Sequence, residues 1–134
     1  MKGNGKLAID TNAAIAYREG IRDVCVLIEG ADTIFLPVVV LGELFYGAAN
    51  SAHPRENEQA VRKFLAQALL VVIDEVIAFR YAVVRSELRK AGRPLPENDL
   101  WVAATCLELD IPLISRDTHF DCIHDLKVVN WTRI

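Results

Sequence analysis

The sequence predicts an α/β protein, a three-layer α/β/α sandwich with a mostly parallel central sheet. Short apolar runs alternate with longer amphipathic segments along the chain, the pattern of strands joined by right-handed helical crossovers. The first apolar run, Leu7-Ala8-Ile9, has no polar face and therefore fits a central strand covered by helices on both sides. At 134 residues, of which 52% are hydrophobic, the chain is most simply one domain spanning residues 1–134.

Glycine and proline mark the boundaries of the expected elements. Gly20 and Gly30 end the first two helices, Pro37 suits the first turn of the third, and residues 92–96 form a rigid loop. Strands are expected at residues 7–9, 33–36, 70–73, 113–115 and 127–129. Helices are expected at residues 13–17, 21–29, 38–47, 56–68, 75–91 and 97–110.

Composition limits the class of protein. The net charge of −3 argues against a generally basic nucleic-acid coat, although acidic residues gathered in a metal site could coexist with basic residues that hold phosphates. The three cysteines lack a CxxC spacing and indicate reduced thiols of a cytosolic protein. The longest apolar run, residues 34–41, is far shorter than the roughly 20 residues that span a bilayer. We therefore expect a cytoplasmic protein without a membrane segment.

Two aspartates stand out by their positions, one at a strand end and one on the apolar face of a helix. Asp10 falls where the first strand ends and a helix begins, at the carboxyl edge of the sheet. Asp99 shares one helical line with Val102, Ala103 and Cys106, so its carboxylate is expected to face the protein interior. The alternative is that both are local: Asp10 as a helix cap, and Asp99 as a first-turn acid that interacts with the helix dipole.

Two further acids could join them. Glu43 borders the apolar stripe of its helix, and Gly47, one turn later, clears space beside the carboxylate. Asp117 follows the strand expected at residues 113–115 by two positions. Taken alone, these residues are a solvated glutamate and a loop aspartate. A parallel sheet, however, can bring all four carboxylates to one edge.

Four carboxylates at close range repel one another and persist only around cations. Ligands that are all oxygen select Mg²⁺ or Mn²⁺. Zinc is not expected, because His53, His119 and His124 lack an i, i+4 spacing and the cysteines are wrongly spaced. His119, near Asp117, is interpreted as a surface turn histidine.

Four segments, taken together and in order, resemble the motifs of PIN-domain ribonucleases, and among these the VapC-type toxins of prokaryotic toxin–antitoxin pairs. The segments are Ile9-Asp10-Thr11-Asn12, Glu43-Leu44 with Gly47, Asn98-Asp99-Leu100-Trp101-Val102-Ala103-Ala104, and Ser115-Arg116-Asp117-Thr118-His119-Phe120. Each motif is weak alone, whereas the ordered set spans the chain.

The resemblance implies a PIN-like fold and cleavage of RNA phosphodiester bonds. It implies a divalent-metal site for Mg²⁺, for which Mn²⁺ can substitute, at Asp10, Glu43, Asp99 and Asp117. Thr11 and Ser115 would stand near the metal, and Asn98 would cap the start of its helix. A homodimer and a cognate antitoxin that blocks the site are also implied.

Basic and apolar residues supply candidate contacts outside the acids. Candidates for RNA phosphate contacts are Arg85, Arg89, Lys90, Arg93 and Arg116. A solvated helix end that favours cations is the alternative for the first four. Apolar residues expected at the surface, for a dimer or an antitoxin helix, are Tyr17, Ile21, Val24, Phe45 and Tyr46. Core packing is the alternative for each.

Two other functions remain open. A response-regulator receiver is also a small α/β domain with an acidic Mg²⁺ pocket, but here no paired acids end the first strand, and only Asp74 follows the third. Labelling of an aspartate by a phosphate donor would favour that function. A non-catalytic PIN-like binding module is the third hypothesis, and partner binding without divalent-ion binding would favour it.

Overall fold

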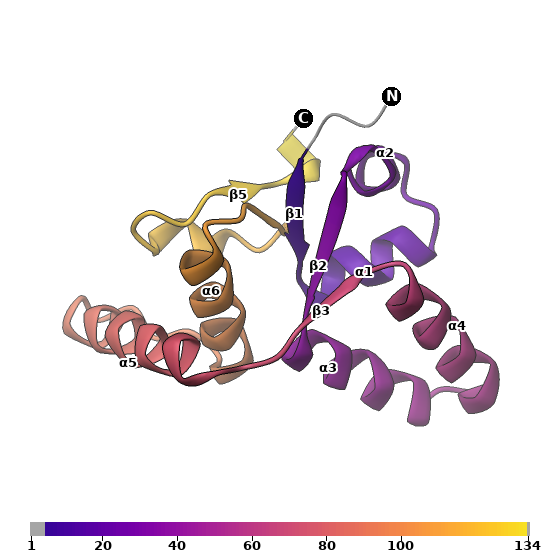
Figure 1. Ribbon diagram of the computed structural model, residues 1–134, viewed down its shortest axis with the longest axis horizontal. Coiled ribbons are helices and arrows are strands. Elements are labelled where there is room, and N and C mark those ends of the chain that lie inside the picture. The colour runs from indigo at the N-terminus through magenta and orange to yellow at the C-terminus, as the bar shows by residue number, and fades with distance from the viewer. Residues whose placement is uncertain (1–4, 134) are drawn as a thin grey trace.

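The computed structural model describes residues 5–133 and contains one sheet of five strands (Figure 1). The strands are β1 (Lys6–Ile9), β2 (Thr33–Pro37), β3 (Leu69–Val71), β4 (Leu113–Ile114) and β5 (Val128–Val129). They lie in the order β3-β2-β1-β4-β5, and every neighbouring pair is parallel. The predicted parallel sheet is therefore confirmed.

Six α-helices flank the sheet. They are α1 (Thr11–Arg18), α2 (Arg22–Gly30), α3 (Val38–Ala49), α4 (Pro54–Ala66), α5 (Glu75–Lys90) and α6 (Glu97–Leu109). Two 3₁₀ turns follow, η1 (Thr118–Cys122) and η2 (Trp131–Arg133). In Figure 1, α5 and α6 lie together on one side of the sheet, and α1, α2 and α4 lie on the other. This arrangement is the expected three-layer sandwich.

The connections reverse direction at the centre of the sheet. The chain moves outward from β1 to β2 to β3, and the α5–α6 crossover then returns it to β4 on the other side of β1. Ala8 of β1 therefore lies between Phe35 of β2 and Leu113 of β4. Ligands of open α/β sheets bind outside the carboxyl ends of the strands at such a reversal point. Here that point is between the ends of β1 and β4.

The central strands are buried on both faces, as their continuous apolar runs predict. Leu7, Ala8 and Ile9 of β1 are buried, as are Leu113 and Ile114 of β4. Helices cover both faces, so no polar alternation is needed in these strands. The burial fixes the position of the residues that follow each strand end.

Several element boundaries differ from the expected ones by one or two residues. Pro37 closes β2 and is the N-cap of α3 instead of lying in its first turn. Pro54 begins α4 at the first helical position, two residues before the expected start. Asp110 adopts a left-handed backbone with φ of 53° and ends α6, which asparagine and aspartate tolerate better than most residues.

The cysteines agree with the expectation of reduced thiols. Cys25, Cys106 and Cys122 are free, and burial raises the pKa of the Cys106 thiol to about 12, so that this thiol stays protonated. Between residues 5 and 133, every helix is too short or too polar to cross a membrane.

Candidate active site

Asp10 stands at the point where the sheet connections reverse, directly after β1. It is the N-cap of α1: its Oδ1 accepts a hydrogen bond of 2.8 Å from the backbone N–H of Ala13. Its Oδ2 accepts a second bond, of 2.5 Å, from the Ser115 hydroxyl. Only 4% of the Asp10 surface is exposed. The capping interpretation is thus right for one oxygen, while the other faces the neighbouring strand end.

Ser115 connects Asp10 to the segment that carries Asp117. Its side chain is fully buried directly after β4, and its hydroxyl oxygen accepts a 3.1 Å hydrogen bond from the backbone N–H of Asp117. Because β1 and β4 are paired neighbours, one hydroxyl reaches both acidic residues. The rigid sheet therefore fixes the spacing of these two acids.

Asp99 lies in the first turn of α6 and is partly buried. The N-cap of α6 is Pro96, without a side-chain hydrogen bond, so the expectation that Asn98 caps this helix is wrong. Proline fixes an extended backbone at the cap position instead. The Asp99 carboxylate interacts through Oδ2 with His119 Nε2 at 2.9 Å, which turns Asp99 toward η1 and the end of β4.

Glu43 projects from α3 toward the start of α1. Its Oε1 accepts a 2.8 Å hydrogen bond from the Thr11 hydroxyl, the residue directly after Asp10. Gly47 lines an open hollow together with Glu43, and a Cβ placed at Gly47 would meet no atom within 4 Å. The glycine therefore leaves space beside the carboxylate, as the sequence predicted, and makes no close backbone contact.

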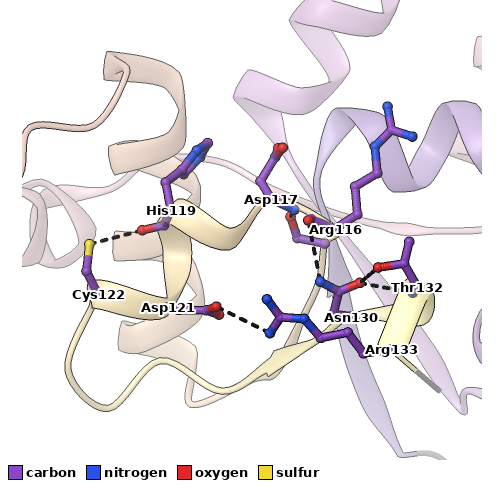
Figure 2. Close-up of polar contacts among 9 residues, drawn as sticks. Arg116, Asp117, His119, Asp121, Cys122, Asn130, Thr132 and Arg133 are labelled. Carbon is purple, nitrogen blue, oxygen red and sulfur yellow. Dashed lines mark hydrogen bonds and ion pairs between the residues drawn. The ribbon is translucent and has the colours of Figure 1, made fainter.

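Asp117 is the N-cap of the 3₁₀ turn η1 and is partly buried. Its Oδ2 accepts a 3.4 Å hydrogen bond from the Asn12 side-chain amide. Figure 2 shows Asp117 and His119 projecting from the same short segment, with Arg116 beside Asp117. The segment is held from behind by the Asn130 amide, which donates a 3.4 Å hydrogen bond to the Arg116 carbonyl (Figure 2).

The four carboxylates influence one another electrostatically. The pKa of Asp10 is raised from 3.8 to about 6: burial is the largest cause, the bonds from Ser115 and Ala13 oppose it, and the like charges of Asp117 and Asp99 add to it. Burial also raises the pKa of Asp99, His119 lowers it, and the charges of Asp117 and Glu43 raise it. The negative charges of Asp117 and Glu43 thus act on Asp99. Those of Asp99 and Asp117 act on Asp10.

This cluster has the donor chemistry of a site for a hard divalent cation. Its side-chain groups are carboxylates together with the Ser115 and Thr11 hydroxyls, and oxygen donors are those that Mg²⁺ and Mn²⁺ prefer. Within residues 5–133, no group of three or more His, Cys, Asp or Glu side chains already has the close arrangement of a metal site. A cation would lower the cost of ionising Asp10 and Asp99, so the residues fit the ion by charge and donor type.

Two polar side chains of this region were missed or undervalued in the sequence. Asn12 holds Asp117, and the signal was its place two residues after Asp10 in the first motif. His119, interpreted as a surface turn residue, instead pairs with Asp99. Its separation from Asp117 by one residue gave no sign of this contact, which depends on the packing of η1 against the start of α6.

The basic residues expected to contact RNA phosphates differ in whether their side chains are already bound to other groups. Arg85 donates a 2.7 Å hydrogen bond to the Tyr81 hydroxyl and lies 3.5 Å from Glu97, whose carboxylate also accepts from Tyr81. By contrast, the side chains of four exposed residues form no ion pair or hydrogen bond within residues 5–133: Arg89, Lys90, Arg93 and Arg116. Arg116 is the one beside an acid of the cluster (Figure 2).

Burial corrects one part of the expected apolar surface. Val24 is fully buried in the core, whereas Ile21 and Tyr46 are exposed. Tyr17 packs against Phe64 with ring centroids 5.8 Å apart, and the Phe45 ring lies under Arg62. The largest run of exposed apolar side chains is elsewhere, at the sheet edge and the start of α5: Leu69, Leu70, Val72, Ile73, Val76 and Phe79.

Comparison with known proteins gives a consistent result. A profile of the PIN domain family matches residues 7–125. Ribonuclease VapC1 of Haemophilus influenzae (strain R2866) is 29% identical over 103 residues, which cover 76% of this chain and 77% of the relative. Ribonuclease VapC5 of Mycobacterium tuberculosis (strain ATCC 25618 / H37Rv) is 30% identical over 128 residues, which cover 94% and 93%.

The fold has solved counterparts as well. The structure of VapBC-1 from nontypeable Haemophilus influenzae matches with a TM-score of 0.85 and 25% sequence identity, over 95% of this chain and 98% of that chain. The resemblance drawn from the four motifs is therefore confirmed. With a profile that matches most of its length, the chain belongs to the PIN domain family.

Proposed function

We propose that this protein is a metal-dependent endoribonuclease that hydrolyses RNA phosphodiester bonds and acts as the toxin of a type II toxin–antitoxin pair. The observation that carries the proposal is geometric: hydrogen bonds tie Asp10 and Asp117 to Ser115 after β4, and tie Glu43 and Asp117 to Thr11 and Asn12, the residues directly after Asp10. Asp99 joins this group through His119, and its charge contributes to the raised pKa of Asp10. The relatives named Ribonuclease VapC support the reaction class.

Asp10, Glu43, Asp99 and Asp117 would hold Mg²⁺, for which Mn²⁺ would substitute. A divalent ion, when bound there, supplies Lewis-acid charge that activates water and offsets the charge developing at the phosphate. The residues themselves prepare the site. Ser115 fixes one oxygen of Asp10, and the Ala13 N–H fixes the other.

The neighbouring polar groups orient the remaining acids. Thr11 holds one oxygen of Glu43, and Asn12 holds one oxygen of Asp117. These bonds limit the rotamers of the carboxylates before substrate arrives, and such preorganisation reduces the reorganisation needed during the reaction. His119 pairs with Asp99 and partly offsets its negative charge.

RNA would be held mainly through its backbone. Arg116, exposed beside Asp117, is the best-placed cation for a phosphate next to the scissile bond. Arg89, Lys90 and Arg93 would contact phosphates further along the strand. Arg85 is a weaker candidate, because Tyr81 and Glu97 already engage its guanidinium.

The partners follow from the same proposal. A cognate antitoxin would inhibit the site, and the VapBC-1 structure from Haemophilus influenzae supports a protein partner. A homodimer would bury the apolar face formed by Leu69, Leu70, Val72, Ile73, Val76 and Phe79. This face includes the edge strand β3, whose outer backbone groups could pair with another chain. The free thiols suit the reducing cytoplasm.

The receiver alternative is less well supported. Asp74, the acid after β3, accepts a 2.8 Å hydrogen bond from the Ile77 N–H and caps α5. It stands at the outer edge of the sheet, whereas Asp10 stands at the centre. A phosphoacceptor at Asp74 would therefore lack the acidic cluster that activates phosphate transfer.

Brief induction of the wild-type chain in a bacterial host tests the proposal. We expect growth arrest and new RNA ends that map to a limited set of sites when cellular RNA is sequenced. Asp10→Asn should abolish both effects, and the matched control Asp32→Asn, an exposed acid beside the opposite end of β2, should keep them. Arrest by Asp10→Asn equal to that by the wild type would contradict the proposed function.

A further inference from the structure

An open hollow borders the carboxylate cluster. Its volume of about 570 Å³ lies within the roughly 300–1,000 Å³ typical of small-ligand pockets. It is lined by residues from the starts of α1 and α6 and from one face of α3: Thr11, Val39, Gly42, Glu43, Tyr46 and Asn98. Because Glu43 belongs both to the hollow and to the carboxylate cluster, a phosphate at the cluster would place its attached nucleoside beside this hollow.

Tyr46 offers this hollow an aromatic surface. Its side chain lies one turn after Glu43 on α3 and is 73% exposed. Within residues 5–133, its ring forms no ring–ring contact and its hydroxyl forms no hydrogen bond. Tyr46 therefore contributes little to the core, and its ring is free to stack on another planar group.

Asn98 offers polar groups on the opposite wall. It is exposed at the start of α6, next to Asp99, and it does not cap the helix because Pro96 is the N-cap. An asparagine amide carries two donors and an acceptor, the combination needed to contact a base edge. The Asn98 side chain is thus not used as the N-cap, and within residues 5–133 it forms no hydrogen bond, so its amide can bind a ligand.

Gly42 leaves open space on the α3 wall of the hollow. A Cβ placed at Gly42 would meet no atom within 4 Å, so the surface at this residue is not filled by neighbouring side chains. An aromatic ring, an amide and a carboxylate cluster thus border one cavity. This combination matches a nucleotide of a single strand, whose base can turn outward while its phosphate contacts the cluster.

We propose that the hollow is a base subsite, in which Tyr46 stacks on an unpaired base next to the scissile phosphate and the Asn98 amide contacts the edge of that base. The inference rests on the proposed function and adds a determinant of substrate choice to it. Stacking supplies affinity for any base, because every base has a π-face. The amide supplies the preference among bases.

Binding of single-stranded RNA in EDTA, where cleavage is prevented, tests the subsite. The probes are a fluorescent RNA that the wild type cleaves in Mg²⁺ and copies with one abasic nucleotide at successive positions. For the wild type, we expect one abasic position beside the cleavage site to weaken binding roughly 5- to 150-fold, the range of stacking on an aromatic side chain. Tyr46→Ala should weaken binding of the intact RNA by a similar factor. This variant should then bind the abasic RNA as well as it binds the intact RNA.

Matched variants separate stacking from folding. Tyr46→Phe keeps the ring and should bind as the wild type does, as should Val26→Ala, which shortens an exposed side chain on α2. In Mg²⁺, Tyr46→Ala should raise KM and leave kcat unchanged, with an unaltered melting midpoint. Asn98→Ala should reduce the preference among the four bases at the stacked position while keeping the abasic penalty.

The outcomes distinguish the two proposals. The base subsite is wrong if Tyr46→Ala binds the RNA as the wild type does. It is also wrong if the loss of affinity from the abasic nucleotide adds to the loss from Tyr46→Ala. In either case, cleavage of RNA by the wild type would still support the ribonuclease function. If the wild type cleaves no RNA in Mg²⁺, the proposed function fails and the subsite fails with it.

Discussion

The Ser115 hydroxyl donates a 2.5 Å hydrogen bond to Oδ2 of Asp10, across 105 positions of sequence. Both residues are buried and follow the paired strands β1 and β4, so the bond spans the point where the sheet connections reverse. A hydrogen bond to the ionised carboxylate favours ionisation, whereas burial opposes it. Burial is the larger effect, and the pKa of Asp10 is raised to about 6.

The raised pKa of Asp10 predicts a pH-dependent stability of the metal-free protein. Since the folded pKa of about 6 exceeds the ordinary 3.8, the folded state binds more protons between these values, and the free energy of unfolding falls as pH rises from about 4 to about 6. At 1.36 kcal/mol per pKa unit, the loss is roughly 3 kcal/mol at most. Asp10→Asn should remove this loss of stability. In urea unfolding in EDTA, the free energy of unfolding of the variant should therefore rise relative to that of the wild type as pH increases across this range. If the free energies of unfolding of the variant and the wild type differed by the same amount at every pH, the raised pKa of Asp10 would be contradicted.

Substitution of Asp99 distinguishes a carboxylate of the cluster from an acid that only stabilises the helix dipole, because the two roles predict stability changes of opposite sign. Burial and the charges of Asp117 and Glu43 raise its pKa, so Asp99→Asn should stabilise the metal-free protein at neutral pH by about 0.5–2 kcal/mol. An acid that mainly stabilises the helix dipole would give destabilisation instead. The measurement is a pair of melting curves in EDTA and in Mg²⁺. Mg²⁺ should raise the wild-type midpoint and shift the variant much less, and equal shifts would exclude Asp99 as a ligand.

The basic residues predict a difference in the salt dependence of RNA binding. Arg116→Ala should weaken binding and reduce the slope of log K against log salt by about 0.7, the value for one phosphate contact to a single strand. Arg85→Ala should change the slope little, because Arg85 is held by Tyr81 and Glu97. Titrations in EDTA at several salt concentrations measure both. Equal slopes for Arg116→Ala and the wild type would remove Arg116 from the phosphate contacts.

The apolar face at β3 and the start of α5 predicts the state of assembly. Phe79 is 73% exposed on this face, so a charge there should prevent burial against a second copy. We expect the wild type to have a dimeric mass at micromolar concentration and Phe79→Glu to have a monomeric mass with an unchanged melting midpoint. Leu109→Glu, an exposed apolar residue at the end of α6, serves as the control and should remain dimeric. A dimeric Phe79→Glu would place the interface elsewhere.

The sequence predicts the sheet well because a strand that is buried on both faces has a continuous apolar run of residues. Leu7-Ala8-Ile9 could be assigned to a central strand since a continuous apolar run has few other solutions. Asp10 and Ser115 could be placed at strand ends for the same reason, although their hydrogen bond depends on the neighbouring positions of β1 and β4. Strand order is a long-range property that local patterns do not encode.

The parts that were wrong or missed depend on packing between elements. Val24 and Ile21 are both aliphatic, yet Val24 lies on the buried face of α2, whereas Ile21 is the exposed N-cap that precedes this helix. The His119–Asp99 pair needs η1 to pack beside α6. Asn98 could be expected to cap its helix from residue type alone, but the preceding proline takes that position.

Cleavage of single-stranded RNA by the purified full chain tests the metal-dependent site most directly. We predict cleavage in Mg²⁺ or Mn²⁺, loss of cleavage in EDTA, and recovery when excess Mg²⁺ is restored. Asp10→Asn should slow cleavage by about 100-fold or more, the loss typical of removing one group that stabilises charge in the transition state, while Asp32→Asn should cleave as the wild type does. Wild-type cleavage rates for Asp10→Asn, or cleavage that EDTA does not affect, would contradict the site and the mechanism.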